Sequence, residues 1–168
     1  MKIEYKSDNI ITAPEPLIIH GCNCQGVMGS GVALAIRNRF PRAFGSYRAT
    51  YIGNDNKLEL GTVIFVTRTD PVTLKYIGNC MTQEYYGRVP NTQYCDYNAI
   101  EKCLLEVKSF CVDSEIDSFA MPKIGCGLGG GDWNIVSNII EKVFIDSNIT
   151  ITIYDNQKIA TQSNRNPI

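Results

Sequence analysis

The run PLIIHGC, residues 16–22, is the feature that most constrains the fold of this chain. Nearly every side chain in it is apolar, whereas a strand with one face in water alternates apolar and polar residues. A continuous apolar run is typical of a strand covered on both faces, as the central strand of a parallel sheet is. We therefore expect an α/β fold in which helices cover both sides of a sheet.

The remaining strands are predicted from shorter patterns. Residues 1–5, MKIEY, alternate apolar and charged side chains and indicate an edge strand. Residues 60–68 and 73–83 predict a hairpin around the turn TDPV, whose Pro71 suits a tight reversal. DSFAMPKI, residues 117–124, resembles a second central strand, and ITITIYD, residues 149–155, is the last predicted strand along the chain.

Helices are predicted between these strands. One begins near Gly31 and ends at Phe40, before Pro41, and a second covers residues 42–52. A third follows from the helical spacing of the apolar residues Ile100, Leu104, Val107 and Cys111, and a fourth covers residues 133–144. We expect an α/β sandwich of three layers, α/β/α, with a mixed and mostly parallel sheet.

The domain organisation is simple. Residues 1–158 predict one domain, and residues 159–168 a polar C-terminal tail. Residues 86–96 are polar and lack periodicity, so we expect an exposed loop that could close over a ligand.

Charge and hydropathy exclude some partners. The 16 Lys and Arg residues balance 17 Asp and Glu residues, and no run of five like charges occurs, which disfavours bulk binding of nucleic acid but not of one small anion. The N-terminal residues lack the apolar core of a signal peptide, and no apolar run approaches about 18 residues. We expect a cytoplasmic protein that does not enter a membrane, a monomer by default.

The cysteines indicate reduced thiols. The chain has seven, an odd number, and no export signal accompanies them. Cys22 and Cys24 resemble a metal pair, but no CxxC motif is present and His20 is the one histidine. We expect no metal and no cofactor.

Two glycine-rich loops follow the two central strands. Gly26, Gly29 and Gly31 lie in the first loop, and GCGLGGGDW, residues 125–133, forms the second. Such loops expose backbone N–H groups that bind phosphate, although close packing of a strand against a helix also selects glycine. Neither loop contains a lysine or the GK[ST] of a P-loop, which disfavours hydrolysis of nucleoside triphosphates. Paired loops at neighbouring strand ends could clamp a diphosphate.

HGCNCQGVMGSGVALAIRNRFPRAFGSY and MPKIGCGLGGGDW together resemble the macrodomain family, whose members bind ADP-ribose. The resemblance is strongest to the branch of yeast-type phosphatases that act on ADP-ribose 1″-phosphate. YKSDNI and ITIYD also resemble the family's first and last strands. The resemblance implies that Asp8 receives the adenine amino group and that Tyr154 stacks on adenine. From the residues alone, Asp8 could equally be a turn residue and Tyr154 an ordinary strand aromatic.

The resemblance implies a site that spans both loops. Asn23 would hold the distal ribose, although an Asn at a strand end often caps a turn. His20 and Asp132 would be the acid and base, although His20 could be a core residue and Asp132 the N-cap of the fourth helix. Cys126, between glycines, could have a lowered pKa. The implied catalytic residues are His20, Asn23 and Asp132, and the implied substrate-binding residues are Asp8, Asn9, Gly29, Ser30, Gly31, Val32, Ile124, Gly125, Cys126, Gly127, Leu128, Gly129, Gly130 and Tyr154.

Two other functions stay open. One is hydrolysis of an ADP-ribose bond on a modified protein or nucleic acid. The family branch that removes ADP-ribose from glutamate uses a lysine and an aspartate, and this chain has Gln83 and Gly129 at the matching positions. The ligands of the zinc-containing branch are also missing. The other function is a reader module that binds ADP-ribose without turnover.

Overall fold

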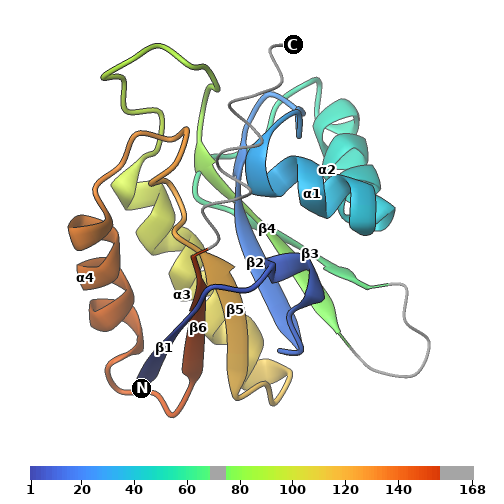
Figure 1. Ribbon diagram of the computed structural model, residues 1–168. Coiled ribbons are helices and arrows are strands. Elements are labelled where there is room, and N and C mark those ends of the chain that lie inside the picture. The colour runs from blue at the N-terminus through green and yellow to red at the C-terminus, as the bar shows by residue number, and fades with distance from the viewer. Residues whose placement is uncertain (69–74, 156–168) are drawn as a thin grey trace.

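A mixed sheet of six strands forms the centre of the protein (Figure 1). The computed structural model describes residues 1–68 and 75–155. Every neighbouring pair of strands is parallel except β3 and β4, which form the expected antiparallel pair; the turn TDPV lies outside the described residues. The strands are β1 Lys2–Lys6, β2 Leu17–Asn23, β3 Val63–Thr67, β4 Tyr76–Gln83, β5 Ser118–Pro122 and β6 Thr150–Tyr154, in the sheet order β1-β6-β5-β2-β4-β3.

Helices cover both faces of the sheet, so the three-layer α/β/α architecture is confirmed (Figure 1). One face carries α1 Gly31–Arg39, α2 Pro41–Gly53 and the short 3-10 helix η1 Ile10–Thr12. The other face carries α3 Tyr97–Asp113 and α4 Trp133–Phe144. None of the helices in the described part of the chain is long and apolar enough to span a membrane.

Local sequence explains where these helices begin and end. Pro41 is the first residue of α2, where its missing N–H costs nothing, and α1 stops just before it. Asp96 and Asp132 cap α3 and α4 by accepting hydrogen bonds from backbone N–H groups. Helix η1 was not predicted, because three residues carry no periodic signal; Asn9 caps it by accepting from the N–H of Ile11.

The central position of β2 confirms what its apolar run predicts. Leu17 and Ile19 pack in the cluster that contains α3 and α4 side chains, whereas Ile18 and Cys22 pack toward α1 and α2. The carboxyl ends of β2, β4, β5 and β6 lie at one edge of the sheet, because these strands are parallel. The segments that follow these strands meet there, as ligand-binding segments do in α/β folds.

Candidate functional site

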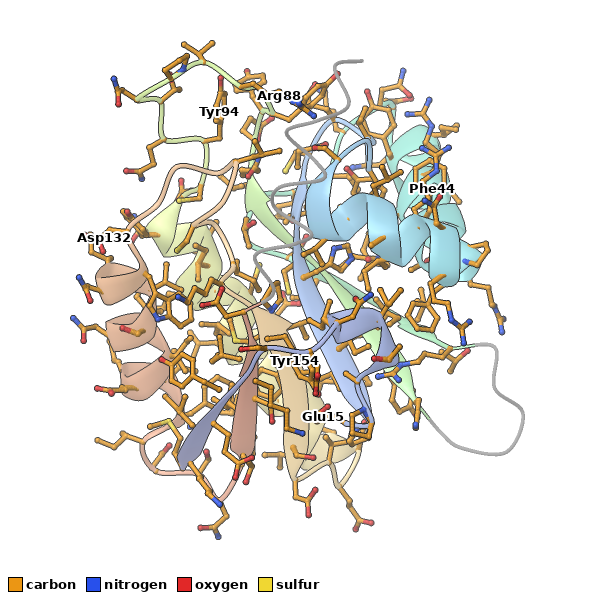
Figure 2. The ribbon with its side chains drawn as sticks, viewed as in Figure 1. Glu15, Phe44, Arg88, Tyr94, Asp132 and Tyr154 are labelled. Atoms are coloured by element: carbon orange, nitrogen blue, oxygen red, sulfur yellow. The ribbon has the colours of Figure 1, made fainter. Side chains whose placement is uncertain are left out.

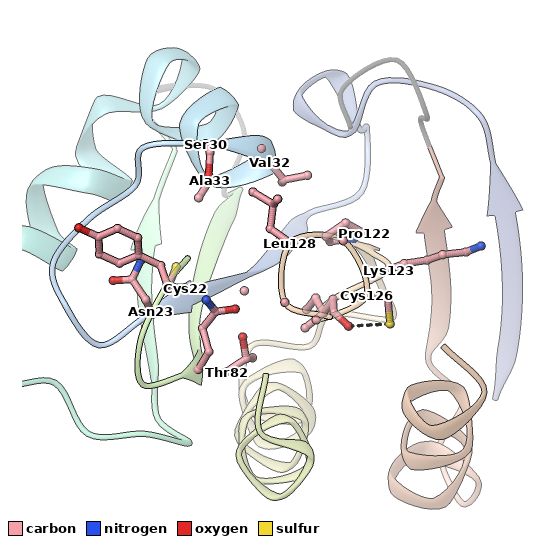
Figure 3. Close-up of a pocket in the computed structure, with 18 of the residues that line it drawn as sticks. Cys22, Asn23, Ser30, Val32, Ala33, Thr82, Pro122, Lys123, Cys126 and Leu128 are labelled. Atoms are coloured by element: carbon pink, nitrogen blue, oxygen red, sulfur yellow. Dashed lines mark hydrogen bonds between the residues drawn. The ribbon is translucent and has the colours of Figure 1, made fainter. Parts of the chain in front are cut away.

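A cavity of about 740 Å³ lies at this edge, between the two glycine-rich loops (Figure 3). Figure 3 shows Asn23 and Cys22 on one side of it and Lys123 and Cys126 on the other. The cavity is lined by residues from the ends of β2, β4, β5 and β6, from η1, from both glycine loops, from the start of α1 and from the long loop after β4. They are Ile10, Gly21, Cys22, Asn23, Val27, Gly29, Ser30, Gly31, Val32, Ala33, Thr82, Gln83, Tyr86, Gly87, Arg88, Pro122, Lys123, Ile124, Gly125, Cys126, Gly127, Leu128, Gly129, Tyr154 and Asp155.

The first glycine loop brings the N-terminus of α1 to the cavity. Gly29, Ser30, Gly31 and Val32 all line it, as expected. The side chain of Ser30 makes no capping hydrogen bond, so it does not occupy the first-turn N–H groups of α1. A helix N-terminus of this kind favours a bound anion. Gly26 lies behind the loop, where a Cβ atom would come within 2.6 Å of Arg48 Nη1.

The second glycine loop forms the facing wall. Residues 124–129 line the cavity, and a hydrogen bond of 2.7 Å from the N–H of Gly131 to the oxygen of Gly125 closes the loop on itself. Gly130 does not line the cavity, in contrast to the expectation from the sequence. It has a φ of +70° and packs against the backbone oxygen of Thr92.

The long loop after β4 supplies the third wall. Its residues Tyr86, Gly87 and Arg88 line the cavity. Its end is fastened to the second glycine loop, because the N–H groups of Tyr94 and Cys95 both donate to the oxygen of Gly129, at 2.8 and 3.0 Å. The expected exposed loop is therefore present and reaches the cavity; its closure over a ligand stays a prediction.

Asn23 lies at the cavity and organises the first loop. Its Oδ1 accepts a hydrogen bond of 2.9 Å from the N–H of Gln25 and one of 2.9 Å from the Tyr47 hydroxyl. Its Nδ2 donates to the oxygen of Val27 at 2.7 Å. Asn23 therefore caps the loop, which is one of the two roles that the sequence left open; its contact with a distal ribose stays a prediction, for which its place at the cavity is suitable.

His20 lies outside the cavity, in contrast to the catalytic role expected from the resemblance. Its side chain is fully buried and its Nε2 lies 2.6 Å from Asn79 Oδ1. Because Asn79 Nδ2 donates to the oxygen of Ala43, Oδ1 is the acceptor and His20 Nε2 carries the proton. Burial lowers the pKa of His20 to about 4. Strand alternation turns His20 toward α2, so it serves as a neutral core residue.

Asp132 is also outside the cavity. Its side chain accepts a hydrogen bond of 2.8 Å from the N–H of Asn134, and its own N–H donates to the Tyr97 hydroxyl. The residue is exposed at the start of α4 (Figure 2). The N-cap role predicted for Asp132 is confirmed, and the carboxylate is engaged there rather than at the cavity.

Tyr154 lines the end of the cavity near β6. Only 4% of the residue is exposed, and its hydroxyl donates to Glu15 Oε2 at 2.8 Å (Figure 2). Burial, together with the charges of Glu15 and Asp8, raises the pKa of Tyr154. Asp8 is exposed and close enough to act on Tyr154, but it does not line the cavity, and neither does Asn9, which caps η1.

The thiol of Cys126 lines the cavity but is not activated. Burial raises the pKa of Cys126 to about 11, and the thiol lies 3.3 Å from the oxygen of Ile124, to which it donates. The lowered pKa that the sequence left possible is therefore not found, because burial outweighs the opposing effect of Lys123. Among the described residues, no group of three or more His, Cys, Asp or Glu side chains is placed to hold a metal ion.

Several cavity residues were not predicted from the sequence. Thr82, Lys123 and Asp155 follow or end β4, β5 and β6, and Arg88 comes from the long loop. The Nζ atom of Lys123 lies 2.9 Å from Asp155 Oδ2, and these charges pair at the Tyr154 end of the cavity. Lys123 and Asp155 lie within MPKIGCGLGGGDW and ITIYD, where the resemblance assigned them no role, and Thr82 and Arg88 lie in no motif. For Thr82, Lys123 and Asp155, the place at the end of a parallel strand was the available signal.

The comparisons with known proteins agree with this architecture. A family model described as "Macro domain" matches residues 19–140. The chain is 32% identical to an uncharacterized 17.5 kDa protein of Enterobacteria phage T4, covering 92% of this chain and 97% of that protein. It is 27% identical to an ADP-ribose 1″-phosphate phosphatase of Debaryomyces hansenii, covering 82% of this chain and 87% of that protein.

Proteins of Mycobacterium tuberculosis are similar to this chain both in sequence and in structure. The chain is 28% identical to a DNA ADP-ribosyl glycohydrolase of Mycobacterium tuberculosis over 84% of its length, and spans 38% of that longer protein. The solved macrodomain of Mycobacterium tuberculosis DarG superposes with a TM-score of 0.78 at 27% identity, covering 90% of this chain and 96% of that domain.

Proposed function

The chain belongs to the Macro domain family, and on this premise we propose that it binds ADP-ribose in the cavity between its two glycine loops. The observation that carries the proposal is the convergence of both loops and the N-terminus of α1 on one cavity of about 740 Å³. Backbone N–H groups of the loops would bind the diphosphate. Tyr154 would contact adenine at one end, and Asn23 the distal ribose at the other.

The same cavity supports hydrolysis of an ADP-ribose derivative, and specifically of the phosphomonoester of ADP-ribose 1″-phosphate. Relatives named as a phosphatase and as a glycohydrolase both match most of this chain. Two of the lining residues that the structure describes carry positive charge: Arg88, from the long loop, and Lys123, which lies at the Tyr154 end of the cavity. Arg88 would attract the terminal phosphate of the substrate.

The side chains beside Asn23 are neutral, which supports a reaction in which water, and not a protein side chain, attacks the substrate. Thr82 and Gln83 line the cavity on the β4 side of Asn23, where the branch that acts on glutamate has its lysine. A covalent lysine intermediate is therefore not part of the proposal. His20 and Asp132 are also left out, because neither lines the cavity.

The test measures binding and turnover in the same buffer. Calorimetric titration with ADP-ribose should show binding, and ADP-ribose 1″-phosphate should release inorganic phosphate. Asn23→Ala should weaken the binding of ADP-ribose and abolish the release of phosphate. Binding without phosphate release would exclude the phosphatase, and an assay on ADP-ribosylated DNA and protein would then separate a glycohydrolase from a reader. Absence of ADP-ribose binding would refute the whole proposal.

A further inference from the structure

Tyr47 supports the cavity from behind. It belongs to α2, is fully buried and does not line the cavity. Its hydroxyl lies 2.7 Å from the backbone oxygen of Asn23 and 2.9 Å from Asn23 Oδ1, so its single hydrogen is shared between these two acceptors. Burial raises the pKa of Tyr47, so the phenol keeps its proton and stays a donor.

These contacts determine which way the Asn23 amide faces. Its oxygen meets three donors, the Tyr47 hydroxyl and the N–H groups of Gln25 and Val27, while its Nδ2 meets an acceptor, the oxygen of Val27. Rotating the amide by half a turn would place NH₂ against the backbone N–H groups of Gln25 and Val27 and oxygen against the Val27 oxygen, which is unfavourable. One of the two Nδ2 hydrogens is used on Val27, so the second is the amide hydrogen that remains for a ligand.

We propose that Tyr47 is a positioning residue that holds the Asn23 amide so that the cavity receives an N–H donor at this point rather than an oxygen. This inference rests on the proposed function for the identity of the ligand. A ribose hydroxyl oxygen or a phosphate oxygen can accept from such a donor. A flipped amide would direct an oxygen at the same atoms and would repel a phosphate.

A double-mutant cycle tests the proposal. Tyr47→Phe keeps the ring and removes the hydroxyl, and it should weaken ADP-ribose binding by about fivefold to tenfold, as expected for one lost hydrogen bond. In an Asn23→Ala background the same substitution should have a much smaller effect on affinity, because the amide that Tyr47 orients is gone and only its bond to the backbone oxygen of residue 23 remains. Equal weakening in both backgrounds would overturn the proposal.

A matched control lies one turn further along the same helix. Tyr51 packs on Arg48, with the guanidinium carbon 5.1 Å from the ring centroid. Tyr51→Phe removes a hydroxyl from α2 without touching Asn23 and should leave affinity unchanged. Circular dichroism and the melting temperature check that each variant is folded. If Tyr47→Phe does not fold, Tyr47→Met supplies the same comparison.

A second measurement does not depend on the ligand. In ¹H–¹⁵N spectra of the ligand-free protein, the side-chain NH₂ pair of Asn23 is assigned by its loss in Asn23→Ala. Tyr47→Phe should shift this pair and speed its exchange with solvent, whereas Tyr51→Phe should not. An unmoved pair would refute the positioning role even if ADP-ribose binds. A moved pair without ADP-ribose binding would instead refute the proposed function and leave the positioning role supported.

Discussion

At the scale of single residues, polar groups near the site divide into those that face the cavity and those that support it from behind. Asn23 faces the cavity, and His20, Asn79 and Tyr47 lie fully buried behind it. The hydrogen bond from His20 to Asn79 continues to the oxygen of Ala43 and so joins β2 and β4 to α2. Because buried polar groups are costly when unpaired, this chain of bonds specifies how α2 sits on the sheet.

The first prediction concerns the pH dependence of stability. The pKa of His20 is about 4 in the folded protein, and an unfolded chain binds the proton near the ordinary value of about 6.5. The contribution of neutral His20 to the free energy of unfolding is complete above about pH 6.5. It is lost as the pH falls toward 4, because the unfolded chain then binds more protons than the folded protein. The total loss from this one group is about 3 kcal/mol. His20→Gln cannot titrate, so its unfolding free energy should fall less than that of the wild type between about pH 7 and about pH 5.

Urea unfolding at the two pH values measures this difference. Because the chain has one histidine, its ring resonances also report the titration without ambiguity. A midpoint near the ordinary histidine value, or parallel pH profiles of the two proteins, would contradict the buried neutral state.

The second prediction separates capping from catalysis at Asp132. Serine also caps helices, so Asp132→Ser should preserve α4 while it removes the carboxylate. Phosphate release from ADP-ribose 1″-phosphate should stay within about twofold of the wild type, and Asp132→Ala should lose about 1 kcal/mol of stability. A large loss of turnover in the stably folded Asp132→Ser variant would show that the Asp132 carboxylate takes part in the reaction.

At the scale of elements, the second glycine loop and the long loop after β4 act as one wall. Gly129 accepts two backbone hydrogen bonds from Tyr94 and Cys95, and Gln83 and Cys95 form an isolated antiparallel bridge. The N–H of Asp96 donates to the oxygen of Thr82 beside that bridge. Both ends of the long loop are thus held close together. The loop residues between these fixed ends include Tyr86, Gly87 and Arg88, which line the cavity.

The third prediction tests this contact with two glycines of the same loop. Gly130→Ala would force a Cβ atom into the oxygen of Thr92 at a φ of +70°, so it should destabilise the protein by about 1 to 3 kcal/mol. A Cβ atom added at Gly127 would meet nothing within 4 Å, so Gly127→Ala should change the unfolding free energy by less than about 0.5 kcal/mol. Equal stability of the two variants in urea titrations would contradict the packing of Gly130 on the long loop.

The strands and helices were largely predictable from the sequence because each has a local signal. The apolar run of β2, the charge alternation of β1 and the capping residue Asp132 were each sufficient to place an element. The site was less predictable, since burial depends on partners that are remote in the sequence. His20 resembles a catalytic residue in the sequence, yet Asn79 and Ala43 hold it in the core. Arg88 reaches the cavity from a loop without any motif, and Lys123 reaches it from a motif in which the resemblance gave it no role.

At the scale of the whole molecule, the cavity joins parts of the chain that are far apart in the sequence. Asn23, Arg88, Gly125 and Tyr154 come from four different segments and line the same space. A ligand that contacts all four would bind the folded state and not the unfolded chain. Binding should therefore be coupled to global stability.

The fourth prediction uses that coupling. ADP-ribose at about 100 times its dissociation constant should raise the unfolding free energy by about 2.7 kcal/mol and raise the melting temperature accordingly. The resemblance assigns the adenine amino group to Asp8, which lies outside the cavity but near Tyr154. On that assignment the guanine analogue of ADP-ribose should stabilise less, because its keto oxygen cannot donate a hydrogen bond to a carboxylate. Thermal shift curves measure the rise in melting temperature that each of the two nucleotides causes. Equal shifts would show that the adenine end does not discriminate.

The edge strand β1 has a consequence for how this protein behaves at high concentration. It pairs with β6 on one side only, so the backbone groups of its other side are available for pairing with a foreign strand. Lys2, Glu4 and Lys6 alternate along it, and Lys2 Nζ lies 2.7 Å from Glu4 Oε1. An incoming chain would have to strip water from these charges before any backbone bond formed. The row of charges on β1 therefore disfavours the addition of a foreign strand at this edge of the sheet, and with it the growth of fibrils.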